Sequence, residues 1–253
     1  MKKGCKLAFM AVMLFTQVFS QQKVSDTAMR VPMFYASYNF QIPIGDLSDR
    51  FGVNSNVGGG FLYKTASGFY LGADFNYIFG KDIRIGDELM SNLKTEAGNI
   101  IDLSGNWTSY ALFERGYYVR GKFGKLLNFV APNPNSGIVL MGGAGYLQHK
   151  VRIQVENNTA PQLQGDYKRG YDRLTGGICI SEFIGYQYLG NSRLVNFMGG
   201  FEFVQGWTSP LRDVNFDTGE PDEKQSRFDG LIGFRIAWII PIYTRMPEEF
   251  YYY

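Results

Sequence analysis

The segment that decides the fold runs from residue 69 to residue 79 and reads Phe-Tyr-Leu-Gly-Ala-Asp-Phe-Asn-Tyr-Ile-Phe. One face of this segment carries the apolar side chains of Phe69, Leu71, Ala73, Phe75, Tyr77 and Phe79. The opposite face carries Gly72, Asp74 and Asn76. Because successive side chains of a β-strand point to opposite faces, this period of two predicts a strand with one apolar and one polar face.

The same alternation recurs along the chain and predicts an all-β protein. The expected strands cover residues 32–42, 54–65, 68–79, 107–125, 136–152, 173–189, 194–206 and 227–240. In the last of them the apolar Phe228, Ile232 and Phe234 alternate with Asp229 and Arg235. The count is therefore eight strands, with ten as the alternative.

The connections between these strands alternate in length. Short connections lie at residues 65–68, 129–136 and 190–192, whereas long polar ones lie at 43–53, 80–106, 153–172 and 207–226. Transmembrane β-barrels have tight turns on the periplasmic side and long loops on the outside. The pattern predicts an antiparallel up-and-down transmembrane barrel with short periplasmic turns and four longer outside loops.

The N-terminal residues 1–20 have the pattern of an export signal, because three lysines precede an apolar run. Their removal takes three of the 25 Lys and Arg and none of the 23 Asp and Glu, which leaves 22 against 23 and a net charge of −1. The basic balance of the full sequence therefore gives no sign of nucleic-acid binding, and we expect no nucleic-acid partner. We assign residues 21–242 to the barrel and residues 243–253 to a periplasmic tail. The expected location is the cell outer membrane.

A soluble lipocalin-like binding barrel is the architectural alternative. It would bury its apolar faces and expose its polar faces to water. The polar faces here carry Gly, Asn and Ser with isolated charges rather than repeated Lys and Glu. That composition favours a narrow polar lumen and a lipid-facing exterior.

A family resemblance rests on three features of the sequence. They are the segment Asn-Phe-Gln-Ile-Pro-Ile-Gly-Asp at residues 39–46, the glycine-rich residues 56–61 and the aromatic last strand. With them the chain resembles the small outer-membrane β-barrel proteins of the Bacteroidota type, and it is similar in architecture to the transmembrane domain of outer membrane protein A. The resemblance implies insertion by the barrel assembly machinery and contact with outer-membrane lipid and lipopolysaccharide. It implies no reaction.

Few side chains offer chemistry. His149 is the only histidine, and some small membrane barrels that this chain resembles are lipid A-modifying enzymes with a histidine beside a serine. No serine motif accompanies His149, so an ordinary rim histidine is the favoured interpretation. One histidine and one mature cysteine, Cys179, cannot build the usual metal sites. We therefore expect no metal, no cofactor and no catalytic residues.

Charged residues on the polar faces predict a cluster in the lumen. Glu182 and Glu202 are expected to lie opposite each other on neighbouring strands, with Arg235 bridging the two carboxylates. Asp74 and Arg120 extend this cluster. Paired charges in a barrel of eight strands predict a plugged core rather than a water-filled pore.

The favoured function is a non-enzymatic structural or accessory subunit of an envelope complex, with a protein partner in that complex. The alternatives are a lipid A-modifying enzyme and the soluble binding barrel. The aromatic residues that end the tail, Phe250, Tyr251, Tyr252 and Tyr253, form a candidate docking segment, because water does not favour an exposed aromatic group.

Overall fold

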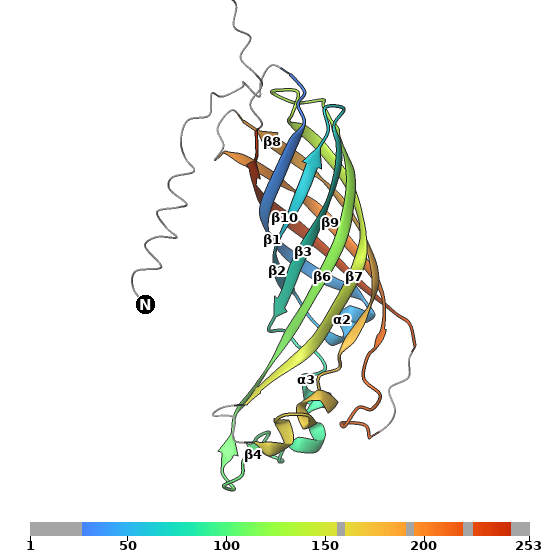
Figure 1. Ribbon diagram of the computed structural model, residues 1–253. Helices are drawn as coiled ribbons and strands as arrows, with labels where there is room; N and C mark the ends of the chain where they lie inside the picture. The colour runs from blue at the N-terminus through green and yellow to red at the C-terminus, as the bar shows by residue number, and fades with distance from the viewer. Residues whose placement is uncertain (1–26, 156–159, 191–194, 220–224, 244–253) are drawn as a thin grey trace, which may run out of the picture.

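The structure is a computed structural model that describes residues 27–155, 160–190, 195–219 and 225–243. Figure 1 shows one closed barrel of tilted strands, with short helices and a small hairpin gathered at one end. Strands tilt in this way because a sheet can close on itself only with a stagger between neighbours. The expected signal at 1–20 and the aromatic end of the tail lie outside the described residues.

Eight strands form the barrel, and their order confirms the predicted up-and-down topology. They are β1 (Val31–Gly45), β2 (Asn54–Lys64), β3 (Phe69–Gly80), β6 (Tyr110–Leu127), β7 (Gly137–Val155), β8 (Thr175–Leu189), β9 (Asn196–Pro210) and β10 (Arg227–Pro241). Each pairs antiparallel with its neighbours in the chain, and β1 closes the ring by pairing with β10. The shortest, β2, has 11 residues, which is enough for a tilted strand to cross a bilayer.

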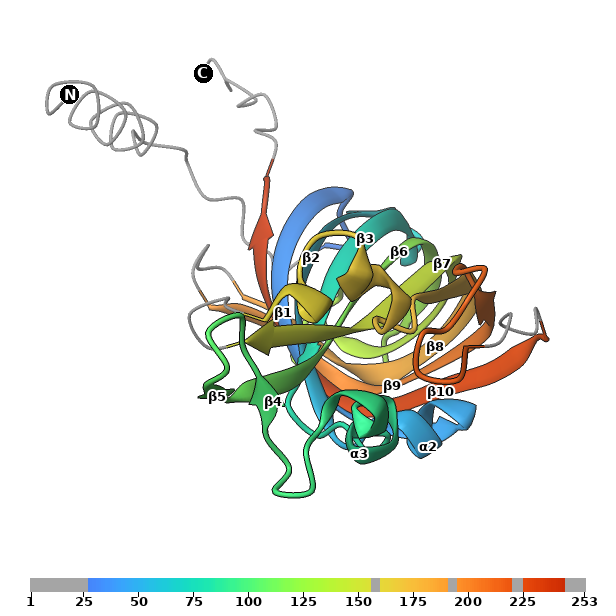
Figure 2. The same ribbon diagram turned by 90° about the horizontal axis from the view of Figure 1, so that it is seen from below.

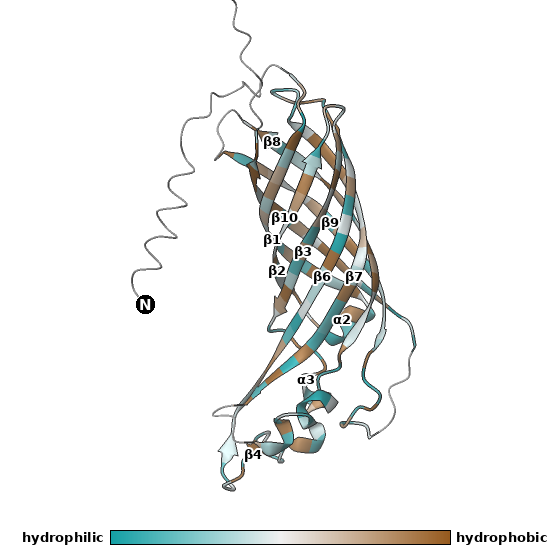
Figure 3. Cartoon of the chain, viewed as in Figure 1, coloured by the Kyte–Doolittle hydropathy of each residue, from teal (hydrophilic) through white to brown (hydrophobic). Residues whose placement is uncertain are grey.

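The alternation in the sequence becomes the two faces of the barrel wall. Figure 3 shows apolar and polar residues alternating along the strands. Large apolar side chains are exposed on the outside of every barrel strand, among them Phe40, Val57, Phe75, Val119, Leu140, Ile184, Phe201 and Ile236. A soluble barrel would instead expose its polar faces to water. The apolar exterior of this barrel therefore indicates contact with lipid. The protein is an outer-membrane β-barrel.

The long outside loops fold into a cap at one end of the barrel (Figures 1 and 2). The cap contains α2 (Asp46–Arg50), α3 (Gly86–Leu89), the 3-10 turns η1 (Ser91–Leu93), η3 (Pro161–Leu163) and η4 (Tyr167–Gly170), and a hairpin of β4 (Ile100–Ile101) and β5 (Trp107–Thr108). Leu89, Met90, Ile100 and Leu163 are buried in one hydrophobic cluster with residues of the barrel interior, such as Leu147. The loops, expected only as polar connections, are therefore packed onto the barrel mouth.

The expected strand at 107–125 is wrong at its start, because β6 begins at Tyr110. The preceding residues turn back into the β4–β5 hairpin. The Asp102 carboxylate accepts hydrogen bonds from the backbone N–H groups of Ser104 and Asn106, both at 2.8 Å, and such local bonds compete with the barrel ladder. Trp107 is consequently an exposed hairpin residue rather than part of an aromatic belt at a barrel rim.

The tight turns lie at the opposite end of the barrel. Gly68 closes the turn after β2 with φ of +80°, a conformation that glycine adopts without strain. The connection between β6 and β7 folds inward, and its buried Asn135 accepts a hydrogen bond from Lys64 at 2.9 Å. Among the described residues, no helix is long and apolar enough to cross a membrane.

Candidate functional site

A charged cluster fills the middle of the barrel. It consists of Asp74 on β3, Arg120 and Lys122 on β6, Glu202 on β9 and Arg235 on β10, and we call these five residues the lumen cluster. All five are at most 4% exposed. They meet because their strands place them on the inward face, where the only neighbours for a charge are the side chains of other strands.

Glu202 is the centre of the lumen cluster. Its Oε1 accepts hydrogen bonds from Arg235 at 2.7 Å, Arg120 at 3.0 Å and Lys122 at 3.1 Å. Its Oε2 accepts one from the Asn39 amide at 3.0 Å. The Tyr118 hydroxyl donates to the same Oε2 at 3.5 Å. Both oxygens are thus occupied, and three of the five donors are cations, which is the arrangement that makes a buried carboxylate tolerable.

Asp74 is the second anion. Arg120 forms a bidentate pair with it, with Nε at 3.0 Å from Oδ1 and Nη2 at 2.8 Å from Oδ2. Arg235 Nη2 lies 3.2 Å from Oδ2, and the Lys122 ammonium lies at the same distance. Bidentate Arg–carboxylate pairs fix geometry as well as charge, so the two carboxylates and three cations lock four strands together.

Neutral side chains complete the surroundings of the two guanidinium groups. Arg235 also donates to Ser37 at 2.9 Å and to Asn76 at 3.2 Å. Arg120 lies over the ring of Tyr118, 4.3 Å from its centroid, a cation–π contact. The lumen cluster is therefore a buried plug whose carboxylates are bonded to side chains of the protein itself.

Of the five residues that the sequence assigned to a lumen cluster, the structure brings together Asp74, Arg120, Glu202 and Arg235. It does not bring in Glu182, and that assignment is wrong. Glu202 pairs with Phe183, whereas Glu182 pairs with Phe203, so the expected register was off by one residue. A slip of one residue moves a side chain to the other face, and Glu182 points outward.

A usable signal for this outward direction was present in the sequence. Glu182 has the same parity as Ile178, Ile180 and Ile184, which form an apolar row on the lipid side. The same parity rule would have found Lys122, which the sequence analysis left out. Lys122 lies two residues after Arg120 and so shares its inward face.

A second buried polar group lies under the cap. Asp229 on β10 accepts hydrogen bonds from Arg50 of α2 at 2.5 Å and from Thr208 on β9, and His149 Nε2 lies 2.8 Å from its Oδ2. Arg50 also donates to Thr175 at 3.2 Å. We call these five residues the mouth cluster. It ties the first outside loop to four strands, β7 to β10.

His149 is therefore not an ordinary rim histidine, because it is buried within the mouth cluster. It has a carboxylate partner, as a catalytic base requires. The nearby Thr208 hydroxyl, however, donates to Asp229, and Thr175 donates to the backbone oxygen of Arg173. Both nearby hydroxyls thus donate to other acceptors, and Nε2 of His149 contacts the Asp229 carboxylate.

No protein-family model matches the sequence, and a comparison with curated proteins finds no match. Among solved structures, Ail of Yersinia pestis, an attachment invasion locus protein, is 8% identical with a TM-score of 0.43, covering 83% of this chain and 99% of its own. The Neisserial surface protein A is 9% identical with a TM-score of 0.39, covering 82% and 96%. The N-terminal β-barrel domain of Pseudomonas aeruginosa OprF is 7% identical with a TM-score of 0.32, covering 81% and 97%.

Proposed function

We propose that this outer-membrane barrel is a non-enzymatic accessory subunit of an envelope complex, of the Bacteroidota type that its residues 39–46 resemble. The observation that carries the proposal is the lumen cluster. A barrel whose interior is filled by bonded, buried charges offers neither a water path nor a free internal site. Its remaining surfaces for interaction are the outer wall, the cap and the periplasmic end.

The mouth cluster supports a non-enzymatic role in the same way. An acyl-modifying enzyme needs a hydroxyl or water that a base can deprotonate at a place substrate can reach. His149 is 1% exposed and bonded to Asp229, which is itself bonded to Arg50 and Thr208. This network is suited to fix the position of the cap on the barrel. A cap in a fixed position can serve as a binding surface for another protein.

The plugged lumen predicts that the purified protein does not conduct. Reconstituted in planar lipid bilayers, it should give no large steady currents, whereas a porin inserted in parallel should. The physical reason is that ions would have to break the buried pairs that fill the barrel. Steady currents from the wild type would show an open lumen and would contradict an accessory role without transport.

The proposed role also predicts a larger assembly. Extracted from its native membrane in mild detergent, the protein should migrate in native electrophoresis with other proteins, at a mass well above 28.6 kDa plus bound detergent. A matched sample refolded alone in the same detergent serves as the control. Co-migration of the extracted protein with the refolded monomer would overturn the proposal.

A further inference from the structure

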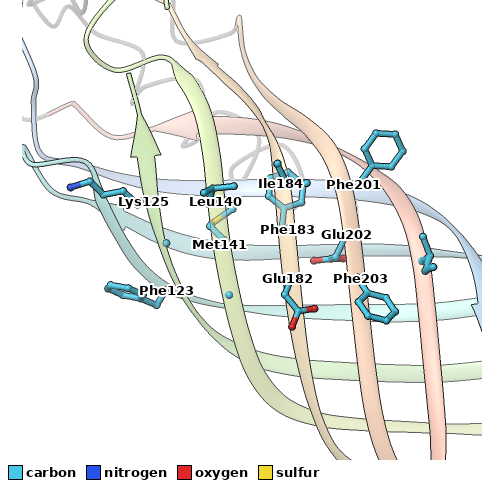
Figure 4. Close-up of a pocket in the computed structure, with 13 residues that line it drawn as sticks. Phe123, Lys125, Leu140, Met141, Glu182, Phe183, Ile184, Phe201, Glu202 and Phe203 are labelled. Atoms are coloured by element: carbon cyan, nitrogen blue, oxygen red, sulfur yellow. The ribbon is translucent and has the colours of Figure 1, made fainter. Parts of the chain in front are cut away.

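An apolar groove runs along the outer wall of the barrel from β6 to β10 (Figure 4). Its volume is about 540 Å³. The walls are large apolar side chains, namely Phe123, Leu140, Ile184, Phe201, Phe203 and Ile232. Its floor includes Gly142, where a Cβ atom would meet nothing closer than 3.9 Å. The groove exists because this outward position lacks a side chain.

A carboxylate lies in this groove. Glu182 is exposed on the lipid side, it faces Gly142 on β7 and Phe203 on β9, and its outward neighbours on β8 are Ile180 and Ile184. It is the middle residue of the 15 in β8. Glu182 therefore lies in the middle of its membrane-spanning strand, seven residues from either end.

Lipid cannot satisfy a carboxylate at this depth. Charged groups within the hydrocarbon are rare, costly and associated with a partner. Lipid headgroups lie at the two surfaces of the bilayer, so they do not reach the middle of β8. On the protein itself, Gln205 donates to Glu182 Oε2 at 3.2 Å. An amide supplies one hydrogen bond and no charge, so a cation is the complementary group.

A second copy of this chain does not offer that cation at the right depth. The outward-facing cations on the described barrel strands are Arg115, Lys125, Lys150 and Arg152. Lys125 lines the β6 edge of the same groove, but it lies two residues from the end of β6 and donates to Ser67 of a periplasmic turn at 2.9 Å. Arg115 donates to Gly80, the last residue of β3, at 3.4 Å. Lys150 pairs with Arg115 and so lies at the same level of the wall, and Arg152 lies two residues nearer to the outer end of β7.

We propose that this groove is the docking surface for the membrane-spanning segment of a partner outer-membrane protein, which places a Lys or Arg side chain against Glu182. The proposal rests on the accessory role above and names the class of partner. Apolar side chains of the partner fill the groove over Gly142, and the Glu182–cation pair sets depth and register. The low dielectric of the surrounding hydrocarbon makes that pair strong.

The test is photo-crosslinking in the native membrane. A benzophenone amino acid replaces Phe203 on β9 in the groove or, as the control, Phe61 on β2, three strands away around the barrel. The position 203 probe should give an adduct to a membrane protein, and mass spectrometry should place the crosslinked peptide in a membrane-spanning segment that contains a lipid-facing Lys or Arg. The position 61 probe should not give this adduct.

Variants then separate charge from shape. Glu182→Leu should reduce the adduct at least about tenfold, because truncation of one member of a buried charge pair weakens binding strongly. Gly142→Leu, which fills the groove, should do the same, whereas Ala36→Leu on the outward face of β1 should not. Glu182→Lys combined with a Glu in place of the partner's cation should restore the adduct. Each variant must retain the folded, heat-shifted gel band.

Three results would overturn the inference. They are an adduct between two copies of this chain, an adduct to lipid alone, and an adduct that Glu182→Leu and Gly142→Leu leave unchanged. Failure of the inference alone would leave the wild type in its larger native assembly. Failure of the proposed function would instead show the extracted wild type as a monomer in native electrophoresis.

Discussion

Glu202→Gln is expected to destabilise the barrel by on the order of 3–5 kcal/mol, because it removes one member of a buried ion network. In the wild type, Arg120, Lys122 and Arg235 face two carboxylates, which gives a net charge of +1. The variant leaves three cations with Asp74 alone and a net charge of +2. The amide keeps the shape of the side chain, so the loss reports on charge rather than on a cavity.

The measurement is unfolding of the detergent-solubilised protein, followed by urea titration and by the temperature at which the compact band in an unboiled gel disappears. Glu182→Gln is the matched control, since it makes the same chemical change on the lipid side of the wall. In pure detergent without a partner, that variant should be as stable as the wild type or slightly more so. Equal stability of the Glu202 and Glu182 variants would show that the lumen cluster does not hold the barrel together.

The strands and their faces were predictable because two different solvents act on the barrel wall. Lipid outside and a narrow polar interior impose a period of two on every strand, and Phe69 to Phe79 shows it over 11 residues. The alternation of Asn39, Asp74, Glu202 and Arg235 with apolar neighbours placed these residues inside without any knowledge of the register.

The pairing of β8 with β9 was less predictable, because it depends on the geometry of the turn. Counting from a tight turn at residues 190–193 puts Glu182 opposite Glu202, but the strands pair Leu189 with Asn196. The connection is thus longer than expected, and the register shifts by one residue, so that Glu182 lies opposite Phe203 rather than Glu202. Only the parity of Ile180 and Ile184 in the sequence opposed the inward placement of Glu182.

The mouth cluster was beyond prediction from the sequence for a different reason. Arg50 and Asp229 are 179 residues apart, and they meet only because closure of the barrel brings β10 beside β1 and its following helix α2. The period of two predicts strands, but it does not predict how a loop folds. The apolar loop residues, such as Leu89 and Ile100, were the available sign that the loops pack onto the barrel.

The mouth cluster carries the last prediction. Asp229→Leu should lower the free energy of unfolding by about 3 kcal/mol, because it leaves the Arg50 guanidinium without its carboxylate in a buried site. The damage should begin in the cap, since Arg50 belongs to α2 and its side chain is already 10% exposed. Hydrogen exchange of residues 46–50 should therefore accelerate more than exchange at the middle of the barrel strands.

The double variant Arg50→Leu with Asp229→Leu decides whether the pair itself is responsible. Removing both charges leaves no stranded ion, so the double variant should be more stable than Asp229→Leu alone. His149→Gln is a second control, because it keeps the Arg50–Asp229 contact at 2.5 Å and should cost less than the loss of Asp229. If the two leucine substitutions were simply additive, the cap would be held by its apolar contacts to the barrel rather than by the mouth cluster.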